Sequence, residues 1–175
     1  MIKIKVGISS CLLGFNVRYD GGHKLNIFLN DSLGALVEYI PVCPEVECGL
    51  GVPRESMRLE GEPENPRLVT TISKQERTAL LVDWANKRVA ELETENLCGF
   101  VFKSDSPSCG MERVKVYSEK VNAFKSGVGI FSRIFMHQFP GLPAEEEVRL
   151  QDLMRRKYFL DRIFAQQRSR DVYSE

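Results

Sequence analysis

The stretch Pro41–Arg54, PVCPEVECGLGVPR, combines two thiols, two acids and two glycines, and it begins within the short apolar run 39–42. Apolar runs of this kind are typical of short buried strands. The strand is predicted to end at Cys43, because Pro44 has no N–H for a sheet ladder and restricts the residue before it. A strand that ends in a thiol and a glycine-rich bend favours chemistry at its carboxyl end, where open α/β sheets bind ligands.

Two other stretches repeat this arrangement of a strand followed by a cysteine. Residues 3–9 (KIKVGIS) are predicted to form a strand that ends just before Ser10 and Cys11. Residues 99–103 (GFVFK) are predicted to form another, and the polar loop 104–110 (SDSPSCG) after it carries Cys109. Since the carboxyl ends of parallel strands meet at one edge of a sheet, we expect the three cysteines to lie together there.

The segments between these strands carry helical patterns. Apolar residues recur at helical spacing over 25–37, and a capping box at Ser73–Glu76 precedes an apolar stripe that predicts a helix over 73–93. The polar segment 55–71, broken by two prolines, is predicted to be a loop or a flap over the site, with residues 69–71 as a candidate short edge strand. This order of elements predicts an α/β fold: a three-layer arrangement with a mainly parallel sheet, helices on both faces and cysteines at the strand C-terminal ends.

The C-terminal part of the chain predicts further elements. Residues 111–117 alternate as in a strand, and 127–139 have the pattern of a helix. In the tail, the acids at 145–147 precede several bases, an order that suits a helix dipole. We therefore predict a catalytic domain over 1–143 and a helical appendage over 144–175 that packs on the same domain.

Composition limits the class of protein. The chain has 175 residues, of which 27% are charged and 43% hydrophobic, as expected for one globular domain. Its 24 basic and 24 acidic residues give a formal net charge of zero, so no nonspecific grip on nucleic acid is indicated, while local recognition of tRNA stays open. Without an 18-residue apolar span or a signal-peptide pattern, we expect a cytoplasmic protein with no membrane contact; the oligomeric state stays open.

The five cysteines are read in that reducing context. Their number is odd and no C-x-x-C pair occurs, so a disulfide framework, a zinc ribbon and a thioredoxin-like centre are all disfavoured. Cys11, Cys43 and Cys109 are the candidates for a shared site, because each follows a strand. Cys98 opens a strand and is interpreted as a small core residue. Cys48 lies in the same loop as Cys43 and is an additional candidate ligand.

Three converging thiolates without a fourth fit two kinds of metal site. One is zinc with an open coordination position. The other is a cubane iron–sulfur cluster, usually held by four cysteines, in which one iron has no protein ligand. Such an iron is a soft Lewis acid suited to a substrate sulfur, so the cluster is the preferred interpretation and zinc the less favoured one.

Three separated motifs resemble, in order, the signature of the DUF523 family, which includes the thiouracil desulfidases. They are SSCLLG with VRYDGG (9–22), VCPE with GLGVPR (42–54), and KSDSPSCG (103–110). The resemblance covers residues 1–143. The tail segment RKYFLDRIFAQQR (156–168) resembles the start of the DUF1722 (YbgA-like) domain.

This resemblance implies a function and a cofactor. It implies a [4Fe-4S] cluster held by Cys11, Cys43 and Cys109, and non-redox removal of sulfur, as hydrosulfide, from a small-molecule thiobase or thionucleoside such as thiouracil or thiouridine. Within the motifs, the serines Ser106 and Ser108 match those of the family's SPSC sequence, and the acid of its CPE sequence is also present.

Chemical roles can be predicted for the polar residues near the three cysteines. Glu45 lies two positions beyond Cys43, past a stiffening proline, and is predicted to move a proton to or from water or the ring nitrogen. Its alternative role is that of a loop carboxylate paired with Arg54 or Arg18. Asp20 is the second acidic candidate. Hydroxyls and backbone N–H groups of the loop after the third strand are predicted to hold developing charge.

Two rival functions stay open. A sulfur-carrier or redox module would use one cysteine as its nucleophile, and it would be colourless with a reactive thiol. A non-catalytic iron–sulfur-binding module would be coloured and indifferent to thiobases.

Overall fold

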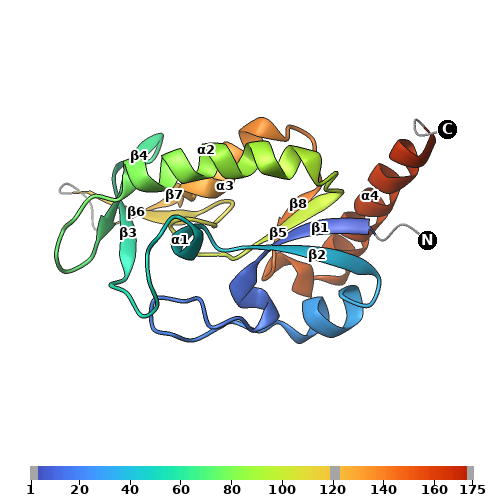
Figure 1. Cartoon of the computed structure of the whole chain (residues 1–175), viewed down its shortest axis with the longest axis horizontal. Coiled ribbons are helices and arrows are strands. Elements are labelled where there is room, and N and C mark those ends of the chain that lie inside the picture. Colours follow the sequence, from blue (N-terminus) through green and yellow to red (C-terminus); the bar gives the residue numbers. More distant parts are fainter. Residues whose placement is uncertain (1–3, 119–122, 173–175) are drawn as a thin grey trace.

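The computed structural model describes residues 4–118 and 123–172, and in that part the chain forms two four-stranded sheets flanked by helices (Figure 1). Lys3, the first residue of a predicted strand, and residues 173–175 of the tail lie outside the described residues. Sheet A has the order β2-β1-β5-β8 and consists of β1 (Ile4–Ser9), β2 (Val37–Val42), β5 (Gly99–Phe102) and β8 (Ala144–Glu146). All its strand pairs are parallel, as predicted.

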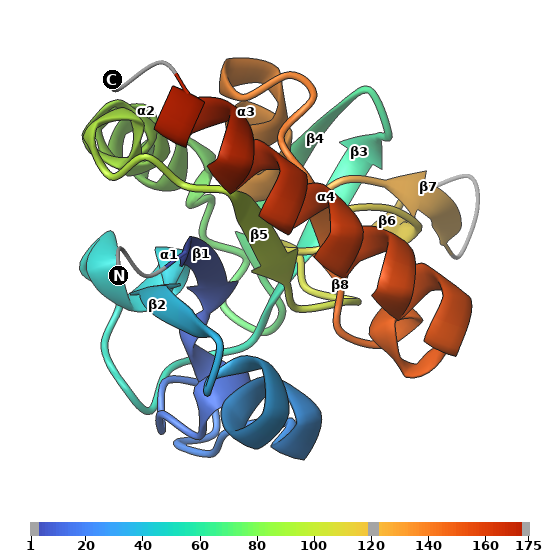
Figure 2. The same cartoon turned by 90° about the vertical axis from the view of Figure 1, so that its right-hand side faces the viewer.

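Sheet A is the middle layer of three. On β1, the side chains of Ile4, Val6 and Ile8 pack on one face, against η2 (Phe28–Leu33) and α4 (Leu153–Val172). The other face is covered by α2 (Thr78–Thr94) and α3 (Ile130–Gln138), as Figures 1 and 2 show. The predicted α/β class, with helices on both faces of a parallel sheet, is confirmed.

The face toward α2 and α3 is built on aromatic rings. Phe100 and Phe102 of β5 stack with ring centroids 4.3 Å apart and contact Phe131 and Phe135 of α3. Gly7 of β1 makes room for this cluster, since a Cβ atom there would lie 2.2 Å from the Phe100 ring. Gly7 in the sequence KIKVGIS therefore leaves space, in the middle of a buried strand, that the Phe100 ring occupies.

Sheet B was not foreseen as a second sheet. It has the order β4-β3-β6-β7 and consists of β3 (Met57–Glu62), β4 (Asn65–Thr70), β6 (Val114–Tyr117) and β7 (Phe124–Gly127). The prediction of a loop or flap over 55–71 is wrong, because β3 and β4 form an antiparallel hairpin, and the short edge strand expected at 69–71 is the end of the longer edge strand β4. Pro66 is tolerated because β4 is the edge strand. The strand expected within 111–117 is confirmed as β6.

Helix boundaries differ from the sequence pattern at two places. The capping box at Ser73–Glu76 is not formed: Ser73 Oγ instead donates to Glu55 Oε2 at 2.7 Å, and α2 begins at Thr78. The helix expected over 25–37 is reduced to the six residues of η2, which has π-helical hydrogen bonding. The helix expected over 127–139 is confirmed as α3.

The acidic tail segment forms a strand rather than a helix start. β8 pairs with β5 in sheet A, and the carboxylate of Glu146 accepts the N–H of Met111 at 2.8 Å, so the helix-dipole interpretation of this run is wrong. The chain continues through η3 (Arg149–Gln151) to α4, whose Phe159 and Ile163 enter the core under sheet A. Within the described residues, no helix has both the length and the apolar character needed to cross a membrane.

Candidate active site

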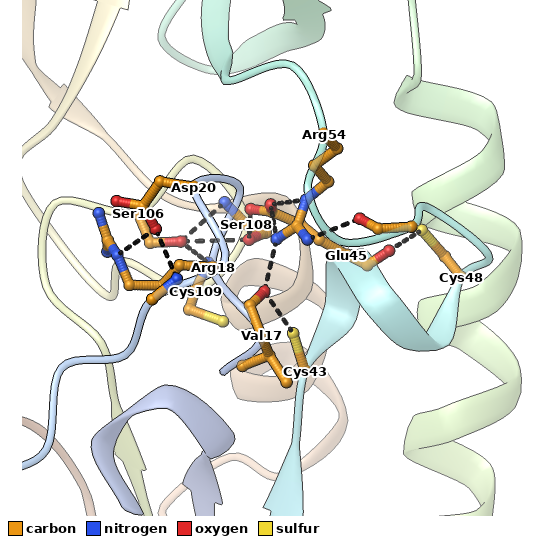
Figure 3. Close-up of polar contacts among 12 residues, drawn as sticks. Val17, Arg18, Asp20, Cys43, Glu45, Cys48, Arg54, Ser106, Ser108 and Cys109 are labelled. Atoms are coloured by element: carbon orange, nitrogen blue, oxygen red, sulfur yellow. Dashed lines mark hydrogen bonds and ion pairs between the residues drawn. The ribbon is translucent and has the colours of Figure 1, made fainter. Parts of the chain in front are cut away.

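The carboxyl ends of β1, β2 and β5 lie side by side at one edge of sheet A. Cys11 follows β1 in the short helix η1 (Ser10–Leu13), Cys43 follows β2 and caps α1 (Pro44–Glu47), and Cys109 lies in the loop after β5. All three side chains line one cavity of about 520 Å³. The structure thus brings together the three cysteines that the sequence placed at one edge; Figure 3 shows two of them, Cys43 and Cys109.

The three thiols are removed from water and influence one another. Cys11 is 9% exposed and Cys109 is 5% exposed. Burial raises the pKa of the Cys11 thiol to about 11 and raises the pKa values of Cys43 and Cys109 as well. Cys11 and Cys43 add to the rise at Cys109, which means that the three sulfurs lie within electrostatic reach of one another.

Nearby groups partly offset the effect of burial on each thiol. The backbone N–H groups of Val46 and Glu45 lower the pKa of Cys43, the Ser9 side chain lowers the pKa of Cys109, and the positive charge of Lys103 lowers the pKa of Cys11. The Cys43 thiol itself donates to the carbonyl of Val17 at 3.9 Å (Figure 3).

Glu45 lies on the wall of the cavity, held at both of its oxygens. Its Oε2 accepts two hydrogen bonds from Arg54, at 2.9 Å from Nε and 2.6 Å from Nη2, and its Oε1 accepts the hydroxyl of Ser108 at 2.8 Å (Figure 3). The Arg54 pairing weighed from the sequence as an alternative role is present. It does not remove Glu45 from the cavity, because both residues line it.

Arg54 also connects two loops at this wall. Its Nη2 donates to the carbonyl of Val17 at 2.9 Å, and its Nη1 donates to that of Gly51 at 3.0 Å. Its own backbone N–H donates to the carbonyl of Tyr19 at 2.8 Å. One arginine therefore fixes the carboxylate and the chain segments on either side of it.

The loop 104–110, named the Cys109 loop, is anchored by side chains and by the start of α3. Ser106 Oγ accepts the N–H groups of Ser108 and Cys109 at 3.3 and 3.0 Å. The N–H of Phe131 donates to the carbonyl of Ser108 at 2.9 Å. Gly129 lies so close to this backbone that a Cβ atom there would be 2.6 Å from the Ser108 carbonyl. The loop is therefore held in place against the helix.

A second ion pair borders the same cavity. Lys103 lines the cavity, and its ammonium donates to Glu147 Oε1 at 2.5 Å and to both the carbonyl and the hydroxyl of Ser104, at 2.8 and 3.0 Å. Glu147 Oε2 accepts the Ser104 N–H at 2.7 Å. These contacts use all three donors of the ammonium, so they fix the position of the Lys103 side chain.

The remaining sequence candidates lie outside the described cavity lining. Asp20 is exposed, accepts the N–H of Gly22 at 3.0 Å and pairs with Arg18 at 3.6 Å. The thiol of Cys48 donates to the carbonyl of Glu45 at 3.3 Å, and its side chain packs on the core of sheet B. Cys98 is fully buried in the core beneath sheet A, as predicted.

Sequence reasoning missed three residues of the site. Ser9 ends β1 and Lys103 directly follows β5. The motifs at these strand ends were interpreted through Cys11 and Cys109 instead. Glu147 lies 44 residues from its partner Lys103, and its position in an acidic run gave no signal of a buried pair. The one sequence signal for Ser9 and Lys103 is that each lies directly at the end of a predicted strand.

The donor set of the cavity can be compared with what a metal cofactor needs. Among residues 4–118 and 123–172, no three His, Cys, Asp or Glu side chains are grouped closely enough to hold a single metal ion. Thiolates on different irons of a cubane stay further apart than ligands of one ion. Three thiols from three strand ends, opening on one cavity, fit a cluster.

Comparisons with known proteins show which proteins the chain is similar to. A solved structure described as a [4Fe-4S]-dependent thiouracil desulfidase, TudS, superposes with a TM-score of 0.67 and 31% identity, covering 85% of this chain and 94% of that one. The uncharacterized protein YbbK of Bacillus subtilis (strain 168) is 31% identical over 111 residues, which span 59% of this chain and 71% of YbbK.

A family model described as 2-thiouracil desulfurase matches residues 6–147. The match includes the three cysteines, both ion pairs and β8, and it ends before the tail segment that resembles the YbgA-like domain. The DUF523 resemblance of the motifs is thereby confirmed. The chain belongs to the 2-thiouracil desulfurase family.

Proposed function

We propose that this protein removes sulfur from a thiolated pyrimidine as hydrosulfide, with a [4Fe-4S] cluster held by Cys11, Cys43 and Cys109. The observation that carries the proposal is the opening of three thiols onto one cavity of about 520 Å³, in a chain of the 2-thiouracil desulfurase family. The similarity to TudS supports the same cofactor. None of the five cysteines is in a disulfide, in keeping with a reducing cytoplasm.

The reaction is a hydrolysis: a C=S bond is replaced by C=O, water supplies the oxygen, and sulfur leaves as hydrosulfide without any oxidant or reductant. When bound, the cluster supplies soft Lewis acidity for the substrate sulfur at the iron that has no cysteine ligand. The chain's own residues have to position the water and the ring and to move protons.

Glu45 is the proposed proton acceptor. Its Oε2 is fixed by Arg54, whereas its Oε1 has a hydroxyl partner, Ser108, that a water molecule can replace. In this role Oε1 takes a proton from the attacking water and returns it, as the C–S bond breaks, to the ring nitrogen of a substrate bound in its N-deprotonated thiolate form. The second proton of the water leaves on the sulfur, as hydrosulfide. Arg54 orients the carboxylate for this step.

The serines of the Cys109 loop have distinct proposed roles. The N–H groups of Ser108 and Cys109 already donate to Ser106 Oγ, so these amides are engaged within the loop. The hydroxyl hydrogens of Ser106 and Ser108 are the groups that can turn toward charge developing on the substrate. Asp20, which is exposed and outside the described lining, is the alternative acid.

The test begins with cofactor content. After anaerobic preparation we expect about four irons and four labile sulfides per chain. Serine at position 11, 43 or 109 should abolish the cluster, whereas Cys98→Ser should retain it as the matched control. Loss of the cluster in Cys48→Ser with retention in Cys43→Ser would contradict the proposed ligand set.

Turnover is measured as hydrosulfide released anaerobically from 2- and 4-thiouracil, the corresponding nucleosides and thiolated tRNA. The member of this panel that is processed identifies the substrate class. A loaded protein that releases no hydrosulfide from any member would favour a non-catalytic cluster-binding module. A colourless protein with one reactive thiol would favour a sulfur carrier.

A further inference from the structure

Cys43 is held through its backbone by a single residue, Glu47. The N–H of Cys43 donates to Glu47 Oε1 at 2.7 Å, and the carbonyl of Cys43 accepts the N–H of Glu47 at 2.9 Å. Because the N–H belongs to the peptide plane before Cα and the carbonyl to the plane after it, the two contacts together fix the φ and ψ angles of Cys43. They thereby fix the direction in which its thiol leaves the main chain.

Glu47 is anchored in turn on the long helix α2. Its Oε2 lies 3.3 Å from Nε of Arg88, in an ion pair whose side chains are 31% and 21% exposed. Ala85 and Val89, the neighbours of Arg88 along this helix, are buried in the phenylalanine-rich core. The carboxylate therefore connects a helix that is fixed in the core to the backbone of a residue that carries a thiol.

The Glu47 carboxylate acts from behind the cavity. Glu47 lies outside the described cavity lining, whereas Cys43 lines it, so this carboxylate supports the wall and is not itself part of it. The helix α1 has only four residues, a length at which a helix has little stability of its own, and the main role of the contact is therefore to place Cys43. A similar contact exists at a second thiol, since the N–H of Cys109 donates to Ser106 Oγ at 3.0 Å.

We propose that Glu47 is a positioning residue for the iron–sulfur cluster, because its hydrogen bond to the backbone N–H of Cys43 holds the thiol of that ligand in place. This inference rests on the proposed cluster. Groups behind metal ligands commonly change metal affinity about 10–100-fold when they are removed. Without the acceptor the Cys43 backbone gains rotational freedom, and its sulfur is expected to dissociate from the cluster more readily.

The test compares three substitutions at one position. Glu47→Ala removes the acceptor, and Glu47→Asp keeps the charge but is one methylene too short to reach the Cys43 N–H from the same backbone. Glu47→Gln loses the charge and keeps a side-chain oxygen that accepts this N–H. Asp152→Ala is the matched control, because Asp152 Oδ1 accepts the backbone N–H of Arg155 at 2.9 Å at the start of α4, outside the described cavity lining.

Two readouts are taken on anaerobically loaded protein: the rate of iron release to a chelator and the EPR spectrum of the reduced cluster. For Glu47→Ala and Glu47→Asp we expect iron release on the order of 10-fold faster than in wild type, with an altered spectrum. Glu47→Gln and Asp152→Ala should keep the wild-type spectrum and stay within about 2-fold of the wild-type rate, well below that effect. Denaturant unfolding of the iron-free proteins shows whether each variant folds.

Other outcomes contradict the inference. Wild-type iron release in a folded Glu47→Ala protein would show that the contact does not hold the cluster. Equal acceleration in Glu47→Gln and Glu47→Ala would assign the effect to the charge that faces Arg88, and equal acceleration in Asp152→Ala would assign it to general loss of stability. A wild-type protein that takes up no iron would overturn the proposed cofactor together with this inference, whereas a loaded wild type with an indifferent Glu47 would overturn the inference alone.

Discussion

Two ion pairs border the cavity, and they differ in how many of their members line it. In the Glu45–Arg54 pair both residues line the cavity, whereas in the Lys103–Glu147 pair Lys103 does so and Glu147 lies outside the described lining. Burial does not distinguish them, since the side chains are 15% and 9% exposed in the first pair and 16% and 8% in the second. The difference is that the first pair brings a carboxylate to the cavity wall and the second does not.

The two pairs also differ in where their parts come from. Glu45 and Arg54 lie nine residues apart around one bend, so a short stretch of sequence builds that wall. Lys103 and Glu147 come from the ends of neighbouring strands of sheet A, β5 and β8. In the first pair one carboxylate oxygen, Glu45 Oε1, is held by a serine hydroxyl rather than by the arginine, whereas all three ammonium donors of the second pair are used within the protein. We therefore expect the first to dominate turnover and the second to dominate stability.

The largest expected effect is on stability, from Glu147→Ala. This change leaves the Lys103 ammonium without its carboxylate and the buried Ser104 N–H without its acceptor. Breaking a buried pair from one side costs about 3–5 kcal/mol of unfolding free energy. Denaturant unfolding measures it, with Lys5→Met as control, because the Lys5–Glu95 pair is exposed to solvent on both sides and such surface pairs contribute little to stability. Equal losses in both variants would contradict the assignment.

The next effect is on turnover, from Glu45→Gln. The amide keeps the size of the side chain and an acceptor oxygen but cannot take a proton. We expect hydrosulfide release to fall on the order of 10²-fold or more with iron content unchanged. Asp20→Asn is the matched comparison, since Asp20 lies outside the described lining. Near-normal turnover in Glu45→Gln together with a large loss in Asp20→Asn would transfer the acid–base role to Asp20.

A smaller effect is expected for Arg54→Lys, which keeps the positive charge but loses the planar fork that reaches Glu45, Val17 and Gly51. Turnover should fall ~10-fold, less than the ~10²-fold that a displacement of about 1 Å can cause. Iron content should not change. Wild-type kcat in this variant would mean that Arg54 acts by charge alone.

The smallest effect is expected when both members of the second pair are replaced together, in Lys103→Met/Glu147→Gln. The double change removes both buried charges and leaves an amide oxygen for the Ser104 N–H. Replacing a whole buried pair is often close to neutral, so the unfolding free energy should stay within about 1 kcal/mol of wild type. A loss as large as that of Glu147→Ala would show that the pair itself, and not the unpaired charge, stabilises the fold.

The part of the site around Glu45 and Arg54 could be predicted from the sequence, whereas the Lys103–Glu147 pair could not. Short apolar runs that end at Pro44 or at the polar loop 104–110 mark strand ends clearly, and parallel pairing then brings Cys11, Cys43 and Cys109 to one edge. Glu45 could be predicted as a site residue because it lies two positions beyond Cys43 in the sequence. These predictions depend on local signals plus one general rule about parallel sheets.

The parts that escaped prediction depend on pairing between distant segments. The acids at 145–147 read as the start of a helix, because their role as a strand depends on the free edge of β5 rather than on their own pattern. Sheet B escaped for a similar reason, since the hairpin of β3 and β4 is polar along much of its length and carries prolines. The unformed capping box at Ser73 was overridden by the Glu55 carboxylate, which offers both a charge and two backbone contacts to the same turn.

The position of β8 has a consequence for self-association. β8 occupies the outer side of β5, a strand whose four residues are all buried. A chain cut after Pro143 would leave β5 as a sheet edge with unpaired N–H and C=O groups beside phenylalanines, and such edges are templates for pairing between molecules. Three tail residues, Ala144–Glu146, two of them acidic, thus protect the most hydrophobic strand of the protein from its own copies.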